Sequence, residues 1–320
     1  MKCTRCEGGL EAGDIRCPVC GLKVPETDAA IDAVLAARVA HRQVLRCNEC
    51  NAAVAYSAQH QNPVCGFCGA VMRVEEPVDP VEQPEARVAL SVPRDTAKEA
   101  LKGWLSQRGF FAPGNLASDS TVDTVHALWW AAWVCDVGAR VSWTADSNVG
   151  SGRSDWAPHS GQAAMQRKNL LVSASRGLTD AETRALTPHY DLSALEAVPA
   201  DAAEVEQFDA QRSAARKVVA DAITAEAVAE AQRQHVPGDR KRNVRAHPMM
   251  VGLSTRRLAM PAWVVVYRFE GKPFRAVVHG QNASVVFGSS PKSIWKILGV
   301  VFGGVLVLAA IVALIAAFSR

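Results

Sequence analysis

The sequence lacks an excess of charge of either sign. Its 320 residues include 35 Lys and Arg against 32 Asp and Glu, which gives a formal net charge of +3. This near-balance excludes a nucleic-acid-binding surface that extends over the whole chain and leaves room only for a local basic patch. Hydrophobic residues make up 49% of the chain, which excludes general disorder. The length allows two or three domains of roughly 100–200 residues each.

The sequence also lacks the short motifs of several enzyme classes. It contains no GxxxxGK[ST] phosphate loop, no HExxH metalloprotease helix and no GxSxG nucleophile elbow. Its eight histidines are scattered singly along the chain. A catalytic constellation can still assemble in space from distant residues, but no pattern favours one. We therefore expect a protein that is not an enzyme.

The first residues, MKCTRCEGG, contain no apolar segment, which argues against a signal peptide. The other end has 22 consecutive residues without a charge, from Ile297 to Phe318. At about 1.5 Å per residue, such a helix spans about 33 Å, which matches a hydrocarbon core of about 30 Å. We expect a single-pass C-terminal transmembrane helix that acts as a tail anchor in the lipid bilayer. The alternative is a buried helix of a globular domain.

The flanks of this segment predict its orientation. Lys292 and Lys296 precede it and only Arg320 follows it, so the weak positive-inside bias places the N-terminal bulk in the cytoplasm, at the inner membrane. Trp295 is expected at the membrane–water interface. A stripe of small residues favours self-association through the helix, unless it reflects only the general frequency of Gly and Ala in such spans. The stripe consists of Gly299, Gly303, Ala310, Ala313 and Ala317.

Eight of the nine cysteines form four CxxC pairs in the first 68 residues. Ten residues separate the first two pairs, and fourteen separate the last two. Two CxxC pairs at such a distance are the ligand arrangement of a four-cysteine zinc ribbon. The predicted ligands are Cys3, Cys6, Cys17 and Cys20 for one Zn²⁺, and Cys47, Cys50, Cys65 and Cys68 for the other. Four protein ligands leave no open position for a reactive water, so both ions are expected to be structural.

Two other interpretations of the cysteine pairs are weaker. Disulfides require an oxidising compartment, and no signal peptide is expected to deliver this end there. A thioredoxin-like site requires a βαβ setting and normally a single CxxC pair. The ninth cysteine, Cys135, lies in the apolar stretch WWAAWVCDV, where a buried core thiol is expected in preference to a nucleophile.

The remaining pattern predicts an α+β protein in six segments. A run of alanines favours a helix between the ribbons, and the acidic, proline-spaced stretch after the second ribbon is typical of a semi-extended linker. The expected segments are zinc ribbon 1 (1–25), a connecting helix (26–46, with its core at 28–45), zinc ribbon 2 (47–73), an acidic linker (74–88), an α+β domain (89–291) and the tail anchor (292–320).

Within the α+β domain, helical and alternating patterns follow one another. The expected elements are a helix at 95–107, a Trp-rich strand region Val125–Ser142 broken at Gly138, a polar loop at 146–165, a long helix at 203–234 and a β-meander at 261–288. The spacing Leu128-x4-Trp133 recurs as Leu258-x4-Trp263, 130 residues later. This echo suggests an internal duplication.

A basic loop is expected between the long helix and the meander. Its cations are Arg240, Lys241, Arg242 and Arg245. One interpretation is contact with phosphates, either of nucleic acid or of anionic lipid headgroups, and the tail anchor favours the headgroups. The other interpretation is a solvated turn.

Several blocks resemble a family of bacterial zinc-ribbon proteins, often described as having a transcription-factor-IIB-type ribbon or as similar to the zinc region of the primosomal helicase. The blocks are Leu90–Pro93, Arg108–Pro113, Trp133–Asp136, Met260–Trp263, Tyr267, Gly271-Lys272 and Gly280-Gln281, beside the ribbon cysteines. The chain departs from the family's pattern in having two ribbons and Asn282-Ala283 in the last turn, and it has no helicase motor motif. The resemblance implies a membrane-attached partner of envelope-stress scaffold proteins of the phage-shock-protein A and flotillin-like (SPFH) kinds.

Two functions are therefore in competition. The first is a non-enzymatic, tail-anchored adaptor whose zinc ribbons recruit protein partners at the cytoplasmic membrane face. The second is a membrane-tethered protein whose ribbons bind nucleic acid. Residues 1–92 hold nine Lys and Arg against twelve Asp and Glu, a net charge of −3. A ribbon that grips phosphates should be basic, so the charge favours the adaptor.

Overall fold

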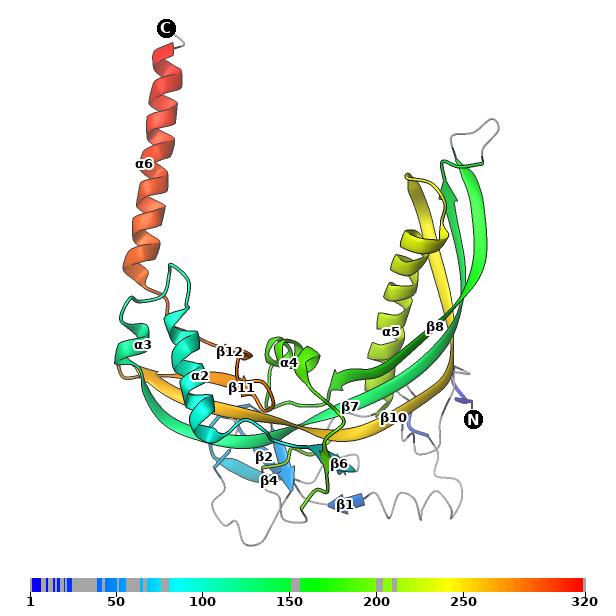
Figure 1. Cartoon of the computed structure of the whole chain (residues 1–320), viewed down its shortest axis with the longest axis horizontal. Coiled ribbons are helices and arrows are strands. Elements are labelled where there is room, and N and C mark those ends of the chain that lie inside the picture. The colour runs from blue at the N-terminus through cyan, green and yellow to red at the C-terminus, as the bar shows by residue number, and fades with distance from the viewer. Residues whose placement is uncertain are drawn as a thin grey trace. The chain divides into compact units, whose positions relative to one another are not determined.

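In a computed structural model of the chain (Figure 1), the described residues are 2–6, 10, 14, 16–17, 20, 22–24, 39–41, 44–50, 52–55, 64–65, 68–75, 81–150, 156–199, 204–208 and 212–318. The chain divides into two compact units. Unit 1 comprises Met1–Ala89 and Leu128–Pro261, and unit 2 comprises Leu90–Ala127 and Ala262–Arg320. The expected α+β class is confirmed, with more strand than the sequence analysis predicted.

Two very long strands dominate the sheet. They are β7 (Thr121–Ser147) and β10 (Lys241–Phe269), which pair with one another, and each contributes residues to both units. In unit 1, β8 (Ala157–Ser173) pairs antiparallel with β7, from Ala132 opposite Ser173 to Ser147 opposite Ala157. The short strands β6 (Ala86–Val88) and β9 (Leu195–Glu196) pair with each other, and β6 also runs parallel to β10.

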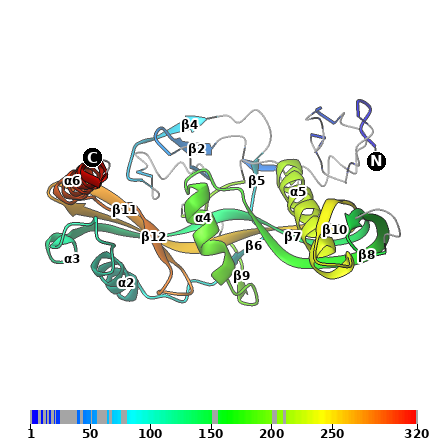
Figure 2. The same cartoon turned by 90° about the horizontal axis from the view of Figure 1, so that it is seen from above.

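One face of the unit 1 sheet is covered by α5 (Arg212–Glu230), which a short π-helix (Ala231–His235) extends. Figure 2 shows α5 lying along β7, β8 and β10. Its apolar residues, including Val219 and Ile223, pack against inward-facing side chains of β7 such as Trp133 and Trp143. Alternate residues of β7 thus face the apolar side of α5, and the side chains between the strand and the helix form the larger core.

A second connection within unit 1 runs through α4 (Asp180–Leu186) and the 3₁₀ turn Thr187–His189. A capping box begins α4, since Thr179 and Glu182 exchange side-chain-to-backbone hydrogen bonds. The following Tyr190 is half-buried. Its hydroxyl accepts a hydrogen bond from Trp130 Nε1 at 3.0 Å and donates one to the carbonyl of Pro261 at 2.8 Å.

Unit 2 packs helix α2 on a small meander. The meander is formed by the end of β10, β11 (Lys272–His279) and β12 (Val286–Gly288), paired antiparallel as predicted for 261–288. Helix α2 (Arg94–Ser106) matches the expected helix at 95–107 and buries Ala97, Leu101 and Leu105. The short helix α3 (Leu116–Asp119) follows it, and α6 (Ile294–Phe318) ends the described chain.

The expected membrane span coincides with α6. Among the described residues, no helix combines the length and the apolar character needed to cross a bilayer. The side chains of 309, 310 and 312–320 lie outside the described part. The predicted span from Ile297 to Phe318 therefore stays a prediction.

The prediction of a connecting helix at 26–46 is wrong for the residues that the structure describes. Residues 25–38, 42 and 43 lie outside the described part, but Val39–His41 forms strand β1 and Val44–Cys47 forms strand β2. The β-branched Val44 begins the run VLRC, which enters the sheet of ribbon 2 and not a helix. Strand β2 lies between β3 (Ala53–Ala55) and β4 (Met72–Glu75), both antiparallel to it.

The acidic stretch is not a free linker in its described part. Residues 76–80 lie outside that part, but Val81–Glu82 forms strand β5, paired with β1, and Ala86–Val88 forms β6. Glu82 accounts for the difference, because its carboxylate forms ion pairs with Arg212 at 3.1 Å and with Arg257. The acidic residue thus holds the segment against the body of unit 1 by charge pairing.

Two glycine-containing regions also differ from expectation. Residues 156–165 of the expected loop belong almost wholly to β8, while 151–155 lie outside the described part. Gly161 stands opposite Trp143, and a Cβ at this glycine would lie 2.5 Å from the indole ring, so only glycine admits the ring there. Gly138 does not break β7, and a Cβ there would lie 2.9 Å from the carbonyl oxygen of Val251. Both glycines mark close approach within a sheet, not an interruption of it.

The expected long helix begins later than predicted. Residues 204–208 are not helical, since Val205, Glu206 and Phe208 form isolated β-bridges. Residues 209–211 lie outside the described part, so α5 starts only at Arg212. Val205 and Phe208 are both buried, and Val205 forms a parallel bridge to Trp129 of β7. The helical propensity of this alanine-rich region is overridden by tertiary pairing.

Candidate metal centres

The eight predicted ligands form two clusters of four sulfur atoms. Within each cluster all Sγ atoms lie within 4.8 Å of one another. Four of the S···S distances are 3.6 Å for Cys3–Cys20, 3.5 Å for Cys6–Cys17, 3.3 Å for Cys47–Cys68 and 3.6 Å for Cys50–Cys65. A tetrahedral ion with Zn–S bonds of about 2.3 Å has ligand sulfurs about 3.8 Å apart. Each cluster can therefore hold one tetrahedral metal ion, as two structural ions require.

The backbone around each cysteine pair turns the thiols toward one point. The amides of Arg5 and Glu49, two residues after a ligand, each donate to that ligand's sulfur at 3.4 Å. In ribbon 2 the amide of Cys65 donates to the carbonyl of Ala70 at 2.8 Å, which closes the turn. Gly69 completes this turn with φ of 78°, a conformation that a side chain strongly disfavours. Gly21 and Gly66, which also directly follow ligand cysteines, lie outside the described part.

The electrostatics of the thiols also fit a cation at each centre. Backbone hydrogen bonds from Arg5 and Cys6 lower the pKa of Cys3 to about 6, which favours its thiolate. The neighbouring Cys65 and burial together raise the pKa of Cys50, and burial raises the pKa of Cys68 to about 11. Thiolates crowded in this way repel one another, and a divalent cation at the centre removes that repulsion. All nine cysteines are free of disulfides.

Ribbon 1 is attached to helix α5 by a buried ion pair. Asp14 lies between its two cysteine pairs, and its side chain is fully buried. Its carboxylate accepts a hydrogen bond from Nη1 of Arg216 on α5, whose side chain is only 10% exposed. A buried charge pair tolerates the loss of one partner poorly, so this contact fixes ribbon 1 on unit 1.

Ribbon 2 is attached through the segment 204–208. The amide of Gln207 donates to the carbonyl of Ala53 on β3 at 2.8 Å, and Val54 and Glu206 form an antiparallel bridge. On its other side, the amide of Glu206 donates to the carbonyl of Trp129 on β7 at 2.8 Å. The segment therefore joins the ribbon sheet to the main sheet of unit 1.

Glu206 holds this joint together and was not singled out in the sequence analysis. It is 1% exposed, and its Oε1 accepts the amides of Arg176 at 2.9 Å and Gly177 at 3.0 Å. Burial raises its pKa to about 7 despite these hydrogen bonds. The sequence gives no local signal for this role, because a glutamate in an alanine-rich region is typical of a solvated helix face.

The surface of ribbon 2 exposes three valines. Val64 is 66% exposed, Val71 60% and Val74 51%, and the first two are partners in an isolated antiparallel bridge. We call these three residues the valine patch. The cations of the same ribbon are paired, since Glu75 binds Arg46 at 2.9 Å and Arg73 at 3.2 Å.

The prediction of a basic loop is wrong for Lys241, Arg242 and Arg245, because β10 begins at Lys241. Most of these cations contact their own chain. Arg240 and Arg242 lie over the ring of Trp156 at 5.7 and 4.2 Å, and Arg242 also pairs with Asp146 at 3.4 Å. Lys241 donates to the carbonyl of Gln232, and Arg245 is exposed on β10. Contact with phosphates stays a prediction.

Of the remaining candidate residues, the structure describes Cys135, Gly299 and Gly303 but not the side chains of the three alanines. Cys135 is fully buried in the core beneath α5, as expected for a packing thiol. Gly299 and Gly303 lie on α6 with open space where a Cβ would stand. The side chains of Ala310, Ala313 and Ala317 lie outside the described part, so the packing stripe stays a prediction.

No family model matches this chain, and no curated protein or solved structure matches it. The resemblance to bacterial zinc-ribbon proteins therefore rests on the quoted sequence blocks alone.

Proposed function

We propose that this chain is a non-enzymatic, tail-anchored adaptor that recruits protein partners at the cytoplasmic face of the inner membrane. Two structural Zn²⁺ ions are proposed for the four-cysteine clusters, because four thiolates in tetrahedral reach of one point suit Zn²⁺ and leave no open coordination position. The resemblance stated above names membrane scaffold proteins of the phage-shock and SPFH kinds as candidate partners.

The observation that carries the proposal is the surface of ribbon 2. Its valine patch is apolar and exposed, and its cations Arg46 and Arg73 are engaged by Glu75. A surface that grips phosphates needs cations facing outward, whereas an exposed apolar patch on a rigid module is typical of a protein interface. The ribbon therefore supports protein binding over phosphate binding.

The attachment of both ribbons to unit 1 supports the same function. Asp14–Arg216 holds ribbon 1, and the segment 204–208 holds ribbon 2, so neither surface has to be ordered when a partner arrives. An interface that is already ordered loses less conformational entropy on binding. The adaptor would thus present a preformed surface.

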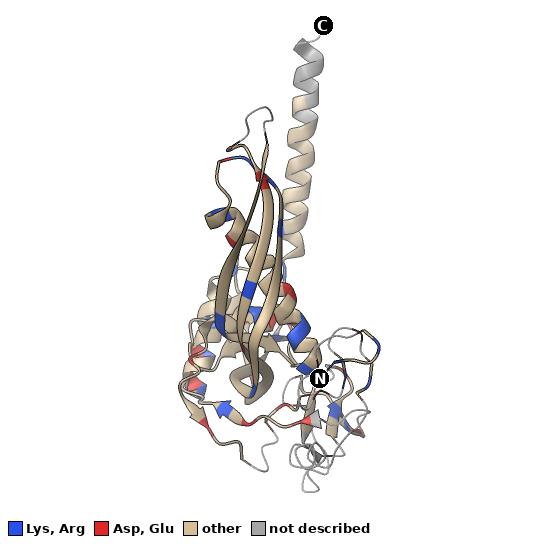
Figure 3. Ribbon diagram, turned by 90° about the vertical axis from the view of Figure 1, so that its right-hand side faces the viewer, with Lys and Arg blue, Asp and Glu red and all other residues tan. Residues whose placement is uncertain are grey.

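The membrane part of the proposal rests on the sequence of α6. Figure 3 shows no acidic or basic residue along the described part of this helix beyond its first turn, in agreement with the charge-free run Ile297–Phe318. The first described side chains of this run are exposed, including Val301 at 59% and Phe302 at 67%. Apolar side chains in such a helix need a lipid or protein environment. Gly299 and Gly303 would allow a second α6 to approach closely.

The experiment that tests the adaptor is affinity purification of the tagged full chain from gently solubilised membranes, followed by mass spectrometry. The test variant carries Val71→Glu and Val74→Glu. The matched control carries Leu195→Glu, at an exposed apolar position of β9. A stoichiometric protein that is retained by wild type and control but lost from the test variant supports the proposal. Equal recovery from all three refutes a role for the valine patch.

A second candidate function, nucleic-acid binding, is favoured by one observation. Ribbon 1 exposes Lys2, Arg5 and Lys23, in contrast to the paired arginines of ribbon 2. The same purifications therefore include a nucleic-acid stain. Nuclease-sensitive, salt-dependent DNA or RNA that is lost on Arg5→Gln and Lys23→Gln substitution would favour this function over the adaptor.

A further inference from the structure

The start of α6 is tied to a loop that lies between α2 and α3 in unit 2. The amide of Ser293 donates to the carbonyl of Phe111 at 2.7 Å, and Nζ of Lys296 donates to the carbonyl of Ala112 at 2.8 Å. Two hydrogen bonds from the helix start thus fix the backbone of this loop. The loop and the first turn of α6 therefore form one surface.

This surface exposes large aromatic side chains. Phe110 is 68% exposed, Phe111 44% and Trp295 84%, and the two phenylalanine rings lie edge to face with their centroids 5.4 Å apart. Such side chains are strongly disfavoured in water when they are exposed together. Tryptophan and other aromatic rings at the end of an apolar helix are typical of the membrane–water interface.

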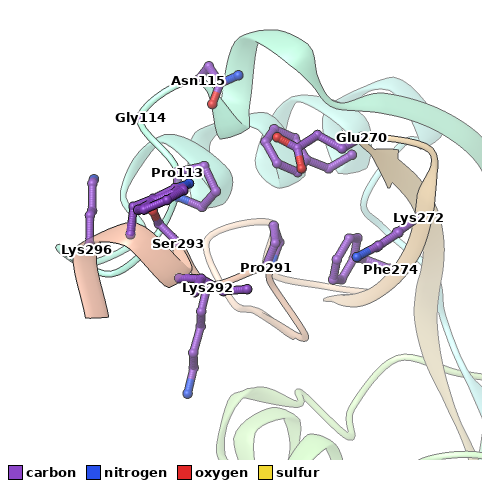
Figure 4. Close-up of a pocket in the computed structure, with 13 residues that line it drawn as sticks. Pro113, Gly114, Asn115, Glu270, Lys272, Phe274, Pro291, Lys292, Ser293 and Lys296 are labelled. Atoms are coloured by element: carbon purple, nitrogen blue, oxygen red, sulfur yellow. The ribbon is translucent and has the colours of Figure 1, made fainter. Parts of the chain in front are cut away.

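Three lysines accompany the aromatic rings. Lys272, Lys292 and Lys296 line a pocket of about 580 Å³ at the start of α6, in which Glu270 is the single acidic side chain. Figure 4 shows Lys272 beside Phe274 and Lys292 directed away from the pocket. Lys296 lies over the ring of Phe110, 5.5 Å from its centroid. The positive charge therefore extends from the pocket to the surface around it.

We propose that this surface, which we call the interfacial collar, binds the headgroup region of a membrane that contains anionic phospholipid. The collar consists of Phe110, Phe111, Lys272, Lys292 and Trp295. The aromatic rings enter the boundary between headgroups and acyl chains, and the lysines contact lipid phosphates. This inference rests on the proposed tail anchor, because α6 would hold the collar at the bilayer surface.

Charge complementarity and position select lipid as the occupant. Lys292 lies directly before α6, and Lys272 at the start of β11 lines the same pocket, so both add positive charge where anionic headgroups would lie. Because α6 continues from the collar without a break, a bilayer that receives the helix meets the collar at the same depth. The collar would then limit the tilt and rotation of unit 2 relative to the membrane.

The test uses the full chain in phosphatidylcholine vesicles with or without phosphatidylglycerol. The photoreactive residue p-benzoylphenylalanine replaces Phe111 in the collar, Phe302 in α6, or Leu195 in unit 1 as a control at another exposed position. Irradiation and mass spectrometry then report lipid adducts. We expect adducts at positions 111 and 302 and none at 195.

The lysines are tested in the chain that carries the photoreactive residue at position 111. Lys272→Gln with Lys292→Gln should lower the adduct yield several-fold, as should omission of phosphatidylglycerol. The charge-matched control, Lys102→Gln with Lys168→Gln, changes two exposed lysines outside the collar and should leave the yield unchanged.

The outcomes separate the collar from the anchor. Adducts at position 302 without adducts at 111 would overturn the collar and leave the anchor in place. Absence of adducts at both positions would contradict the tail anchor and the collar together. Adducts at 111 that depend on neither lysines nor phosphatidylglycerol would overturn the proposed headgroup contacts.

Discussion

Replacing Glu206 by alanine should weaken the joint between ribbon 2 and the main sheet of unit 1. The carboxylate accepts the amides of Arg176 and Gly177, and its own backbone bridges Val54 and Trp129. Loss of an acceptor for a buried amide costs about 1–3 kcal/mol. For two amides we expect the free energy of unfolding of unit 1 to fall by about 2–6 kcal/mol.

The raised pKa of Glu206 predicts that the stability of the chain depends on pH. Burial raises its pKa in the folded chain to about 7, compared with about 4.5 for an unperturbed glutamate. Between these values the folded state keeps a proton that the unfolded state releases, so stability is fully present below about pH 4.5 and is lost as the pH rises through 7. The shift corresponds to roughly 3 kcal/mol.

Glu206→Gln separates the two effects. Glutamine keeps an acceptor oxygen for Arg176 and Gly177 but cannot titrate. Its stability should therefore match that of wild type at pH 4.5 and exceed it by up to about 3 kcal/mol at pH 8, because only wild type is destabilised as its carboxyl group ionises. The measurement is urea unfolding followed by tryptophan fluorescence between pH 4.5 and 8, with Trp129 next to the joint. The difference between wild type and Glu206→Gln cancels other titrating groups. A difference that does not change with pH, or an alanine variant as stable as wild type, would refute this reasoning.

Two further predictions concern attachment and packing. Arg216→Met removes a cationic partner of the buried Asp14 carboxylate and should cost about 3–5 kcal/mol. We expect faster hydrogen exchange in ribbon 1 while ribbon 2 keeps its protection, and unchanged exchange would contradict the docking of ribbon 1. Leu101→Ala removes a fully buried side chain from α2 and should lower the free energy of unfolding of unit 2 by about 2–5 kcal/mol. The control Lys102→Ala, at the exposed neighbouring position, should have little effect. Equal effects of the two variants would contradict the packing of α2.

The parts of the fold that depend on local pattern were predictable. The CxxC spacing identified all eight residues of the two clusters because a metal site needs ligands at short, fixed separations. Helix α2 and the meander followed from apolar periodicity, which local sequence carries directly. In these cases the determining residues lie close together in the sequence.

The parts that failed depend on distant partners. Asp14 and Arg216 are separated by 202 positions, and neither has a local signature that announces a buried pair. Gly161 suggested a loop, yet the ring of Trp143 across the strand pair fills the space beside it. The docking of the ribbons on unit 1 is likewise a tertiary property, so the sequence predicted a semi-extended linker after ribbon 2 and did not predict the contacts that attach both ribbons.

This attachment changes how the adaptor would work. A ribbon on a free linker gains reach, whereas a ribbon joined to β7 through the segment 204–208 presents its surface in a fixed direction. The valine patch would then meet a partner as part of unit 1 as a whole. Metal binding and partner binding would be coupled, because Val74 lies on β4, which pairs with the strand of the ligand Cys47, and Val64 and Val71 bridge one another on either side of the ligands Cys65 and Cys68.

The most direct test of the adaptor is to measure zinc content and partner recovery on the same purified samples. Wild type and a Cys135→Ser control should contain two zinc ions per chain and retain the partner. Cys47→Ser with Cys50→Ser should contain one zinc ion and lose the partner, because the valine patch would lose its supporting strands. Two zinc ions in the double variant, or full partner recovery with only one, would contradict the proposal that a metal-built ribbon binds the partner.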